Sequence, residues 1–254
     1  QGAKEMEELE SMLNLMQRDQ VADDQVAVLA IVRQLGGSSS KYLRERKRAV
    51  QRLVAEIYSP PRVTAAAKLL PELRCIPGFA FDVTTNNEDG EPWDFDIAEN
   101  RRRARERVLM DKPMLLVGSP MCTAFSAWQY INNKKRDPTL VAREYVRAMV
   151  HIRFVMELYA IQHAAGRYFL HEHPVGAMSW AEAEVRQIAL MPNVVTVVGD
   201  QCQYNAEDKV GAPIKKPTKF MTNSSCIGNA LSRRCSGKLG MCSRPKGGHH
   251  ALCN

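Results

Sequence analysis

A lone cysteine after an apolar run is the residue of this sequence best placed for nucleophilic chemistry. Residues Met114 to Gly118 predict a buried strand, a turn follows at Ser119 and Pro120, and Cys122 comes directly after it. In an open α/β sheet, functional side chains gather just past the carboxyl ends of the strands. The pattern therefore indicates a reactive thiol at a sheet edge. The alternative is that Cys122 is a small buried hydrophobic residue.

A second apolar run ends in a carboxylate. Residues 167–174 read Arg-Tyr-Phe-Leu-His-Glu-His-Pro, which predicts a strand carrying Glu172 between His171 and His173. Because successive side chains of a strand point to opposite faces, Glu172 lies on the face opposite both histidines. We expect the two strand ends to face one site, with a surface salt bridge as the alternative role of Glu172. A metal pair formed by the two histidines lacks an identifiable third ligand.

The C-terminal segment 224–254 carries a third chemical pattern. It has few apolar residues and no clear periodicity, so it cannot build a core from its own side chains. Thiolates and imidazoles are the ligands of tetrahedral zinc, and the spacing of six, six and three residues singles out four of them: Cys235, Cys242, His249 and Cys253. The spacing matches no CxxC-type pattern, so a zinc-stapled tail and an unstapled one both remain open.

The elements that must position these residues alternate along the chain. Strands are predicted at residues 54–58, 76–82, 93–97, 114–118, 167–174, 193–198 and 219–222, and helices at 64–70, 100–110, 139–166 and 180–190. Strands separated by helices imply parallel βαβ units. The predicted fold class is α/β, with a doubly wound, mostly parallel sheet.

The predicted domain organisation has three parts. Residues 1–53 form a helical N-terminal segment, with helices over 5–18, from Asp23 or Asp24 to Leu35, and over the very basic stretch 41–53. That basic stretch is either a solvated face or a phosphate-contacting one. Residues 54–223 form the α/β domain, and residues 224–254 form the Cys/His-rich tail.

Composition and charge restrict the class of partner. The net charge of +7 and pI near 9.1 favour an anionic partner, nucleic acid first, against the alternative of a generally basic surface. No apolar run approaches the roughly 18 residues of a membrane span. The first residues lack the apolar core of a signal peptide, and seven cysteines form no even disulfide framework. These features predict an intracellular protein with reduced thiols and no membrane partner.

The order of strand ends resembles the DNA cytosine-5 methyltransferases, a family with a Rossmann-like fold that binds S-adenosylmethionine. Segment 118–126, Gly-Ser-Pro-Met-Cys-Thr-Ala-Phe-Ser, is similar to the family's Gly-Pro-Pro-Cys-Gln-x-Phe-Ser loop. Segment 169–174 is similar to the strand ending Glu-Asn-Val, and segment 210–220 to Gly-Val-Pro-Gln-x-Arg-x-Arg. The resemblance covers residues 54 to about 223. More loosely, Ser-Pro-Pro-Arg and Trp-Asp-Phe are similar to methyltransferase-like segments of eukaryotic mobile-element polyproteins.

The resemblance implies methyl transfer to C5 of cytosine in nucleic acid, DNA favoured over RNA, on a base flipped out of the duplex. Cys122 would be the nucleophile and Glu172 the catalytic glutamate. Nuclear localisation follows if the source is eukaryotic and the substrate DNA. The implied cofactor-binding residues are Ser59, Pro60, Asp82, Asp96 (or Asp94), Ser119 and Pro120. The implied substrate-binding residues are Thr123, Ser126, Lys216 and Lys219, with Lys215 and Arg101 to Arg103 as further phosphate contacts.

The sequence also departs from the family pattern. The first loop, residues 59–62, contains no glycine, although the family brings its backbone close to the cofactor there. Met121 replaces proline, Thr123 replaces glutamine, His173 replaces asparagine, and lysines replace arginines. No insertion of the size of a target-recognition domain is present between these motifs. Two alternatives follow: a degenerate methyltransferase fold that binds nucleic acid without catalysis, and an N4/N6 amino-methyltransferase in which Cys122 is a bystander.

Overall fold

The computed structural model describes residues 29–38, 52–70, 72 and 74–251. The backbone divides into two compact units, residues 1–51 and residues 52–254, and each is considered by itself. The described part of the first unit, residues 29–38, contains a helix over residues 29–34. A turn at Leu35 and Gly36 follows it, and Gly36 has φ +77°. The predicted helix over 5–18 lies outside the described residues, as does the basic stretch 41–53 apart from its last two positions.

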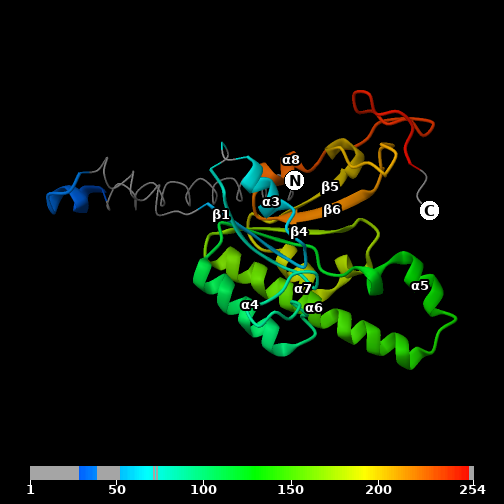
Figure 1. Cartoon of the computed structure of the whole chain (residues 1–254), viewed down its shortest axis with the longest axis horizontal. Helices are drawn as coiled ribbons and strands as arrows, with labels where there is room; N and C mark the ends of the chain where they lie inside the picture. Colours follow the sequence, from blue (N-terminus) through cyan, green and yellow to red (C-terminus); the bar gives the residue numbers. More distant parts are fainter. Residues whose placement is uncertain (1–28, 39–51, 71, 73, 252–254) are drawn as a thin grey trace, which may run out of the picture. The chain divides into compact units, whose positions relative to one another are not determined.

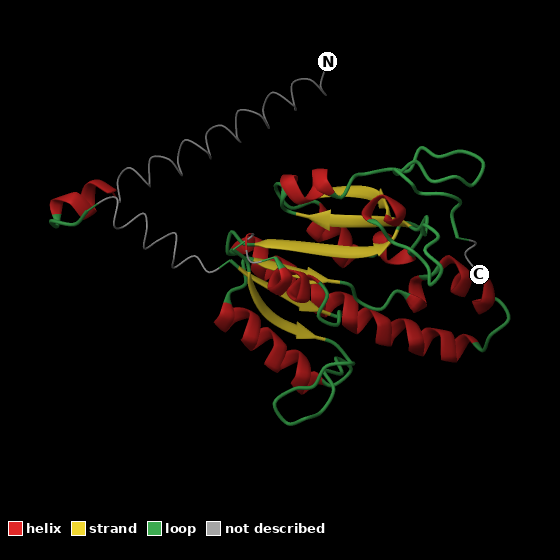
Figure 2. Ribbon diagram, turned by 45° about the horizontal axis from the view of Figure 1, so that its top comes forward, coloured by secondary structure: helices red, strands yellow, loops and turns green. Residues whose placement is uncertain are grey.

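The second unit is built on one six-stranded sheet (Figures 1 and 2). Its strands are β1 (Leu53–Ile57), β2 (Ile76–Phe81), β3 (Leu115–Gly118), β4 (Tyr168–Pro174), β5 (Val195–Asp200) and β6 (Pro217–Thr222). The spatial order is β2-β1-β3-β4-β6-β5. Strands β1 to β4 pair in parallel, and β6 is antiparallel to both of its neighbours. The predicted α/β class with a mostly parallel sheet is confirmed, and this arrangement is compatible with a Rossmann-like fold.

Helices cover both faces of the sheet. Helices α3 (Val63–Leu69) and α8 (Ser225–Ala230) lie on one side, and α4 (Ala98–Asp111), α6 (Pro138–Ala164) and α7 (Ala183–Ala189) on the other (Figure 1). Short 3₁₀ turns are η2 (Thr123–Phe125), η3 (Met178–Ala181) and η4 (Gln201–Tyr204), and α5 (Ala127–Asn133) follows η2. In the part of the chain that the structure describes, no helix is both long and apolar enough to cross a membrane.

The long helix α6 carries much of the core. It begins where Asp137 accepts a hydrogen bond from the backbone N–H of Thr139, with proline at the first helical position. Its inner face buries Ile152, Val155, Leu158 and Tyr159 completely against the sheet. At this level of burial, each such side chain contributes roughly 1.5–3 kcal/mol to folding. The helix therefore fixes the position of the strands that carry the candidate site.

One predicted strand is wrong. Residues 93–97 form an irregular segment with a turn at 95–96, because the side chain of Asp94 accepts a hydrogen bond from the N–H of Asp96 and Asn100 donates to the backbone oxygen of Asp94. Trp93 and Phe95 are nevertheless buried, and Trp93 stacks on Phe81 with ring centroids 4.0 Å apart. The alternation of apolar and acidic residues therefore marks a folded-over segment that packs on the sheet edge. Helices α5 and α8 were not predicted.

Candidate functional site

The carboxyl ends of β1, β3 and β4 lie in register. Ile57 pairs with Gly118, and Gly118 pairs with His171. The strand order reverses between β1 and β3, because the chain runs from β1 outward to β2 and then returns to the other side of β1. Ligands of open α/β sheets bind at such a switch point, outside the carboxyl ends of the strands. The next residue along each of the three strands stands at this edge: Tyr58, Ser119 and Glu172.

Glu172 is the partly buried acid at this edge. Its carboxyl is hydrogen-bonded to Ser119 and lies near the cationic groups of Lys216 and Arg62. Burial raises the pKa of Glu172 above its ordinary value of 4.5, and Lys216, Ser119 and Arg62 offset only part of this rise. A raised pKa is the direction of shift that acid catalysis near neutral pH requires of a carboxyl.

The loop after β3 carries the candidate nucleophile. Cys122 is partly buried and stands at the start of η2, where its backbone oxygen accepts a hydrogen bond from the N–H of Phe125. Its thiol forms no hydrogen bond with any described residue. The buried ring of Phe125 anchors the loop, while Thr123 is exposed. We name Ser119, Cys122, Glu172 and Lys216 together the strand-end site.

His173 joins this loop to β4. Its buried ring donates from Nε2 to the backbone oxygen of Pro120 over 2.7 Å, and its Nδ1 accepts from the hydroxyl of Ser179 over 2.7 Å. A carbonyl only accepts, so the proton resides on Nε2. Burial lowers the pKa of His173 to about 4, which keeps the ring neutral. His173 therefore positions the Cys122 loop against the strand of Glu172, a role that the sequence analysis did not anticipate.

The predicted cofactor loop after β1 is shaped by a buried carboxylate in place of glycine. Glu56 is fully buried and accepts hydrogen bonds from the backbone N–H groups of Arg62, Val63 and Thr64 and from the Thr64 hydroxyl. The first N–H groups of α3 are thus already satisfied. Within the loop, Tyr58 has φ +56°, a conformation that bulky residues rarely adopt.

Ser59 and Pro60 are the predicted cofactor residues of this loop, and they contact each other. Ser59 is buried and its hydroxyl donates to the backbone oxygen of Pro60 over 2.9 Å. This contact fixes the turn within the loop.

The two predicted cofactor acids are placed differently. At the end of β2, Asp82 uses Oδ1 to accept from the N–H and hydroxyl of Thr84, and Oδ2 has no partner among the described residues. Asp96 has both oxygens engaged, Oδ1 with His151 Nε2 at 3.1 Å and Oδ2 with Arg147. The hydrogen bond from Arg147 lowers the pKa of Asp96. Asp82 keeps an acceptor for a ligand, whereas Asp96 serves the protein's own packing.

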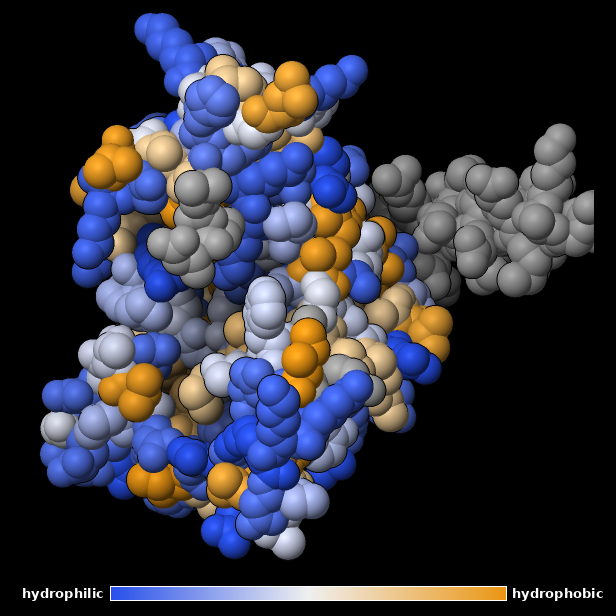
Figure 3. All heavy atoms as spheres, turned by 90° about the vertical axis from the view of Figure 1, so that its right-hand side faces the viewer, coloured by the Kyte–Doolittle hydropathy of each residue, from blue (hydrophilic) through white to orange (hydrophobic). Residues whose placement is uncertain are grey.

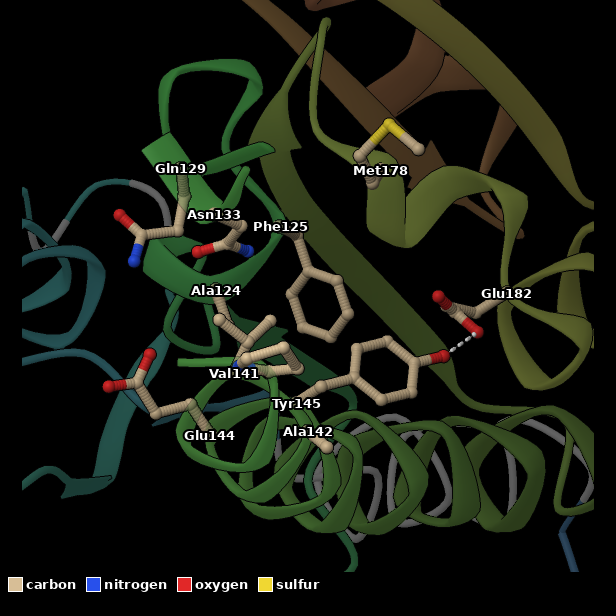
Figure 4. Close-up of a pocket in the computed structure, with 11 residues that line it drawn as sticks. Ala124, Phe125, Gln129, Asn133, Val141, Ala142, Glu144, Tyr145, Met178 and Glu182 are labelled. Carbon is tan, nitrogen blue, oxygen red and sulfur yellow. Dashed lines mark hydrogen bonds between the residues drawn. The ribbon is translucent and has the colours of Figure 1, made fainter. Parts of the chain in front are cut away.

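Two cavities lie against the Cys122 loop. The first, of about 320 Å³, is lined by Met121 and Thr123 from the loop and by Arg147 and His151 from α6, among others. The second, of about 430 Å³, lies between η2, α5 and α6, where Phe125 and Tyr145 face each other and Tyr145 donates to Glu182 (Figure 4). Both are lined by Ala124, Gln129 and Glu144, so they adjoin.

The predicted substrate-binding residues fall into three situations. Lys216 lies near Glu172 and His173 and acts on both electrostatically. Lys219 places its ammonium 4.6 Å from the ring centroid of Trp180, a cation–π contact. Ser126 caps α5, because its hydroxyl accepts from the N–H of Gln129. Of these three, Lys216 is the one that the fold brings to Glu172.

A Cys/His cluster stands beyond the end of β5. Its four ligand atoms all lie within 4.8 Å of one another, and the Cys235 sulfur is 4.0 Å from the Cys242 sulfur and 3.5 Å from His250 Nε2. Ligands at about 2.3 Å (S) and 2.0 Å (N) from a tetrahedral zinc would lie about 3.5–3.8 Å apart. The cluster can hold a metal ion. We name it the tail cluster: Cys202, Cys235, Cys242 and His250.

The surroundings of the tail cluster favour a thiolate at Cys235, whereas burial raises the pKa of Cys202 to about 11. Burial opposes ionisation of Cys235, but hydrogen bonds from the hydroxyl and N–H of Ser243 outweigh it and lower the pKa of Cys235 to about 6. Gln203 donates to the sulfurs of both Cys202 and Cys242. The buried Asp200 accepts from the N–H of Cys235 over 2.7 Å. Such outer contacts orient first-layer ligands.

The tail cluster differs from the predicted ligand set. Cys235 and Cys242 belong to it, but His250 takes the place predicted for His249, because the residue 249 backbone is bridged to Met241 and its side chain points elsewhere in the hairpin. Cys253 lies outside the described residues. Cys202 was missed, since it is far upstream in the chain and reaches the tail only because β5 ends beside it.

Comparison of the chain with models of protein families, with curated proteins and with solved structures found no match.

Proposed function

We propose that this protein transfers a methyl group from S-adenosylmethionine to C5 of cytosine in nucleic acid, DNA in the first place, with Cys122 as nucleophile and Glu172 as acid. One observation carries the proposal. Glu172 is partly buried, has a raised pKa and is hydrogen-bonded to Ser119, three residues before Cys122 on the adjoining loop. A thiol and a carboxyl whose pKa is raised by burial stand at neighbouring strand ends, and this reaction requires such a pair.

The chemistry explains the need for both groups. The Cys122 thiol gives its proton to solvent, and the thiolate adds to C6, which moves the C5–C6 electron pair onto C5. The Glu172 carboxyl donates a hydrogen bond to N3 and so neutralises the charge that develops on the ring. When bound, S-adenosylmethionine would supply an electrophilic methyl group that the electron pair on C5 takes up, while the methyl–sulfur bond breaks to leave a neutral thioether. Loss of the C5 proton to solvent then expels the thiolate and restores the C5–C6 double bond.

The residues present offer a partial fit to the methyl donor. Asp82 retains one carboxylate oxygen for a ribose hydroxyl, and the turn of Ser59 and Pro60 stands beside Ser119 at the switch point. The cavity of about 320 Å³ next to Met121 and Thr123 provides a polar and apolar lining within reach of the loop. Asp96 would first have to release His151 and Arg147. These side chains would hold and orient the donor.

The tail cluster is proposed to hold zinc in a structural role. Three cysteines and one histidine fill the four tetrahedral positions, so no position remains for a catalytic water. The segment it holds has little apolar surface of its own, and a metal is a common substitute for a core in such segments.

A second candidate function is a nucleic-acid-binding module without catalysis. Two observations favour it: Glu56 occupies the N-terminus of α3, and both carboxylate oxygens of Asp96 are engaged within the protein. Both reduce the groups available to a methyl donor. Calorimetric titration with S-adenosylmethionine separates the two functions. A nucleic-acid-binding module that does not bind the methyl donor should give no heat of binding.

The test of the leading function uses an oligonucleotide that contains 5-fluorocytosine. Because fluorine cannot leave as the proton does, the covalent adduct should persist through denaturation when the methyl donor is present. Cys122→Ser should abolish the adduct, while Cys226→Ser, a change at an exposed thiol, should retain it. Methylation of ordinary DNA without any adduct would refute the Cys122 mechanism and favour amino-methyl transfer.

The zinc assignment has a separate test. We expect one zinc per chain by elemental analysis of the purified protein. A content well below one removes the zinc proposal and leaves the methyl-transfer proposal untouched.

A further inference from the structure

The carboxyl edge of the sheet lies between two projecting parts of the second unit. The tail lies on one side, and α5 with the first half of α6 on the other (Figures 1 and 2). Seen end-on, the surface is hollowed between these two parts (Figure 3). A polymer lying across the strand-end site would therefore meet the tail, and the chemistry of the tail's outer surface indicates which polymer it would be.

The outer surface of the tail is cationic. Between residues 224 and 254 the sequence has five lysines and arginines and no aspartate or glutamate. Arg234 is paired with Asp200, and Arg244 with Glu207. Lys238 and Lys246 are exposed, and neither ammonium is paired with a carboxylate among the described residues. Unpaired lysines on a segment without acids attract a polyanion.

Residues 235–242 of the tail form a tight loop, which we call the tail hairpin, and its tip carries an exposed apolar residue. Leu239 is 96% exposed and has φ +50°, a left-handed conformation that a bulky side chain adopts only where the surroundings impose it. The hairpin neck is tight, because a Cβ on Gly237 would lie 1.8 Å from the backbone oxygen of Met241. The tail cluster closes the other end of this hairpin through Cys235 and Cys242. A rigid hairpin thus holds an apolar side chain out in water beside Lys238.

We propose that residues 235–247 form a nucleic-acid grip, in which Lys238 and Lys246 contact backbone phosphates and Leu239 packs into a groove of the duplex. Apolar side chains placed between base steps or in a groove, flanked by cations, are a recurrent way of holding DNA. The grip belongs to the tail, which lies on one side of the carboxyl edge of the sheet (Figure 1). It rests on the proposed function only in taking nucleic acid as the partner.

The experiment measures binding without a methyl donor. A fluorescein-labelled DNA duplex of about 30 base pairs is titrated with wild type and variants at several salt concentrations, with anisotropy as readout. Lys238→Glu combined with Lys246→Glu should weaken binding roughly tenfold or more and lower the slope of log K against log salt by about two. Leu239→Ala should weaken binding with an unchanged slope, because it removes no charge.

The matched control is Lys68→Glu combined with Lys112→Glu. Both lysines are exposed: Lys68 lies in the last turn of α3 and Lys112 is the C-cap of α4, and both helices lead back to the amino edge of the sheet. This control has the same net charge as the grip variant and should bind at least several-fold more tightly. Equal binding by the two double variants, or no binding of the duplex by wild type, overturns the grip. Adduct formation on 5-fluorocytosine is scored separately, so failure of the grip and failure of methyl transfer give different results.

Discussion

The strand-end site and the tail cluster stand at the same edge of one sheet but are held in place by different forces. Ser119 and Glu172 are carried by β3 and β4, whose backbone hydrogen bonds and buried side chains need no ligand. The tail cluster gathers Cys202 and three tail residues from loops with little apolar surface. The first site is preorganised by the fold, whereas the zinc ion that we propose for the tail cluster would hold its segment together. Variants of the strand-end site should therefore lose activity, whereas variants of the tail cluster should lose bound zinc and stability.

The largest expected effect is on catalysis by Glu172→Gln. The amide keeps the shape but cannot donate a carboxyl proton, so kcat/KM should fall by about 10²- to 10⁴-fold. A variant with more than a tenth of wild-type activity would contradict the assigned role.

The same Glu172→Gln substitution should not lower the stability of the protein. The raised pKa means that the folded protein binds more protons than the unfolded chain above pH 4.5, so wild type loses stability as pH rises through this window. Glu172→Gln lacks that loss and should be at least as stable as wild type at neutral pH by urea denaturation.

Cys242→Ser should show the reverse pattern. Loss of one ligand should reduce bound zinc from one per chain to near zero and lower the thermal midpoint by several degrees, since metal binding stabilises the folded state. Activity of the remaining folded protein should fall less than tenfold. Cys226→Ser, at an exposed thiol outside the tail cluster, is the control and should retain zinc. An unchanged metal content in Cys242→Ser would show that the two regions do not differ in this way.

A smaller effect is expected for His173→Asn. The pKa of His173 is about 4 in the folded protein, below its ordinary value of 6.5. The unfolded chain therefore binds more protons between these values, and the stability due to neutral His173 is present above pH 6.5 and lost as pH falls toward 4. The full contribution is at most about 3 kcal/mol. Unfolding free energies of the variant from pH 4 to 7 should rise less steeply than those of wild type.

The smallest effect is expected for Lys216→Met. The Lys216 ammonium lowers the pKa of Glu172, so its removal should raise that pKa further. Because the proposed mechanism uses the protonated carboxyl, the alkaline limb of the pH–rate profile should move to higher pH by a fraction of a unit. Lys215→Met is the control, since Lys215 has no such influence on Glu172. A shift to lower pH in Lys216→Met would mean that the ionised form is active.

Sequence patterns predicted the parts of the fold that depend on continuous apolar runs. Strands β1 to β4 are each a short apolar run with turn-forming or polar residues after it, and all four were placed within about two residues. The strand predicted at residues 93–97 was wrong because an alternating pattern indicates only that alternate side chains are buried. The irregular segment found there buries Trp93 and Phe95 just as a strand would. Helix α5 was not predicted, because its start depends on a cap by Ser126 within a short loop.

The candidate sites divide along the same line. Cys122 and Glu172 were singled out because each directly follows a recognisable strand, so local sequence determines both the chemistry and the approximate location. The role of His173 depends on a carbonyl more than fifty residues upstream, and the choice of Cys202 and His250 depends on where β5 and the hairpin end. No local pattern records such pairings, because they arise from packing between segments that are distant in the chain.

The sequence by itself therefore determined the α/β class, the approximate bounds of β1 to β4 and the reactive groups at the ends of β3 and β4, since apolar periodicity and residue chemistry are local properties. The tertiary structure decided the antiparallel placement of β6 between β4 and β5, the buried setting that raises the pKa of Glu172, and the four members of the tail cluster. Desolvation and ligand geometry exist only once distant segments have packed together, and that is the physical reason for the division.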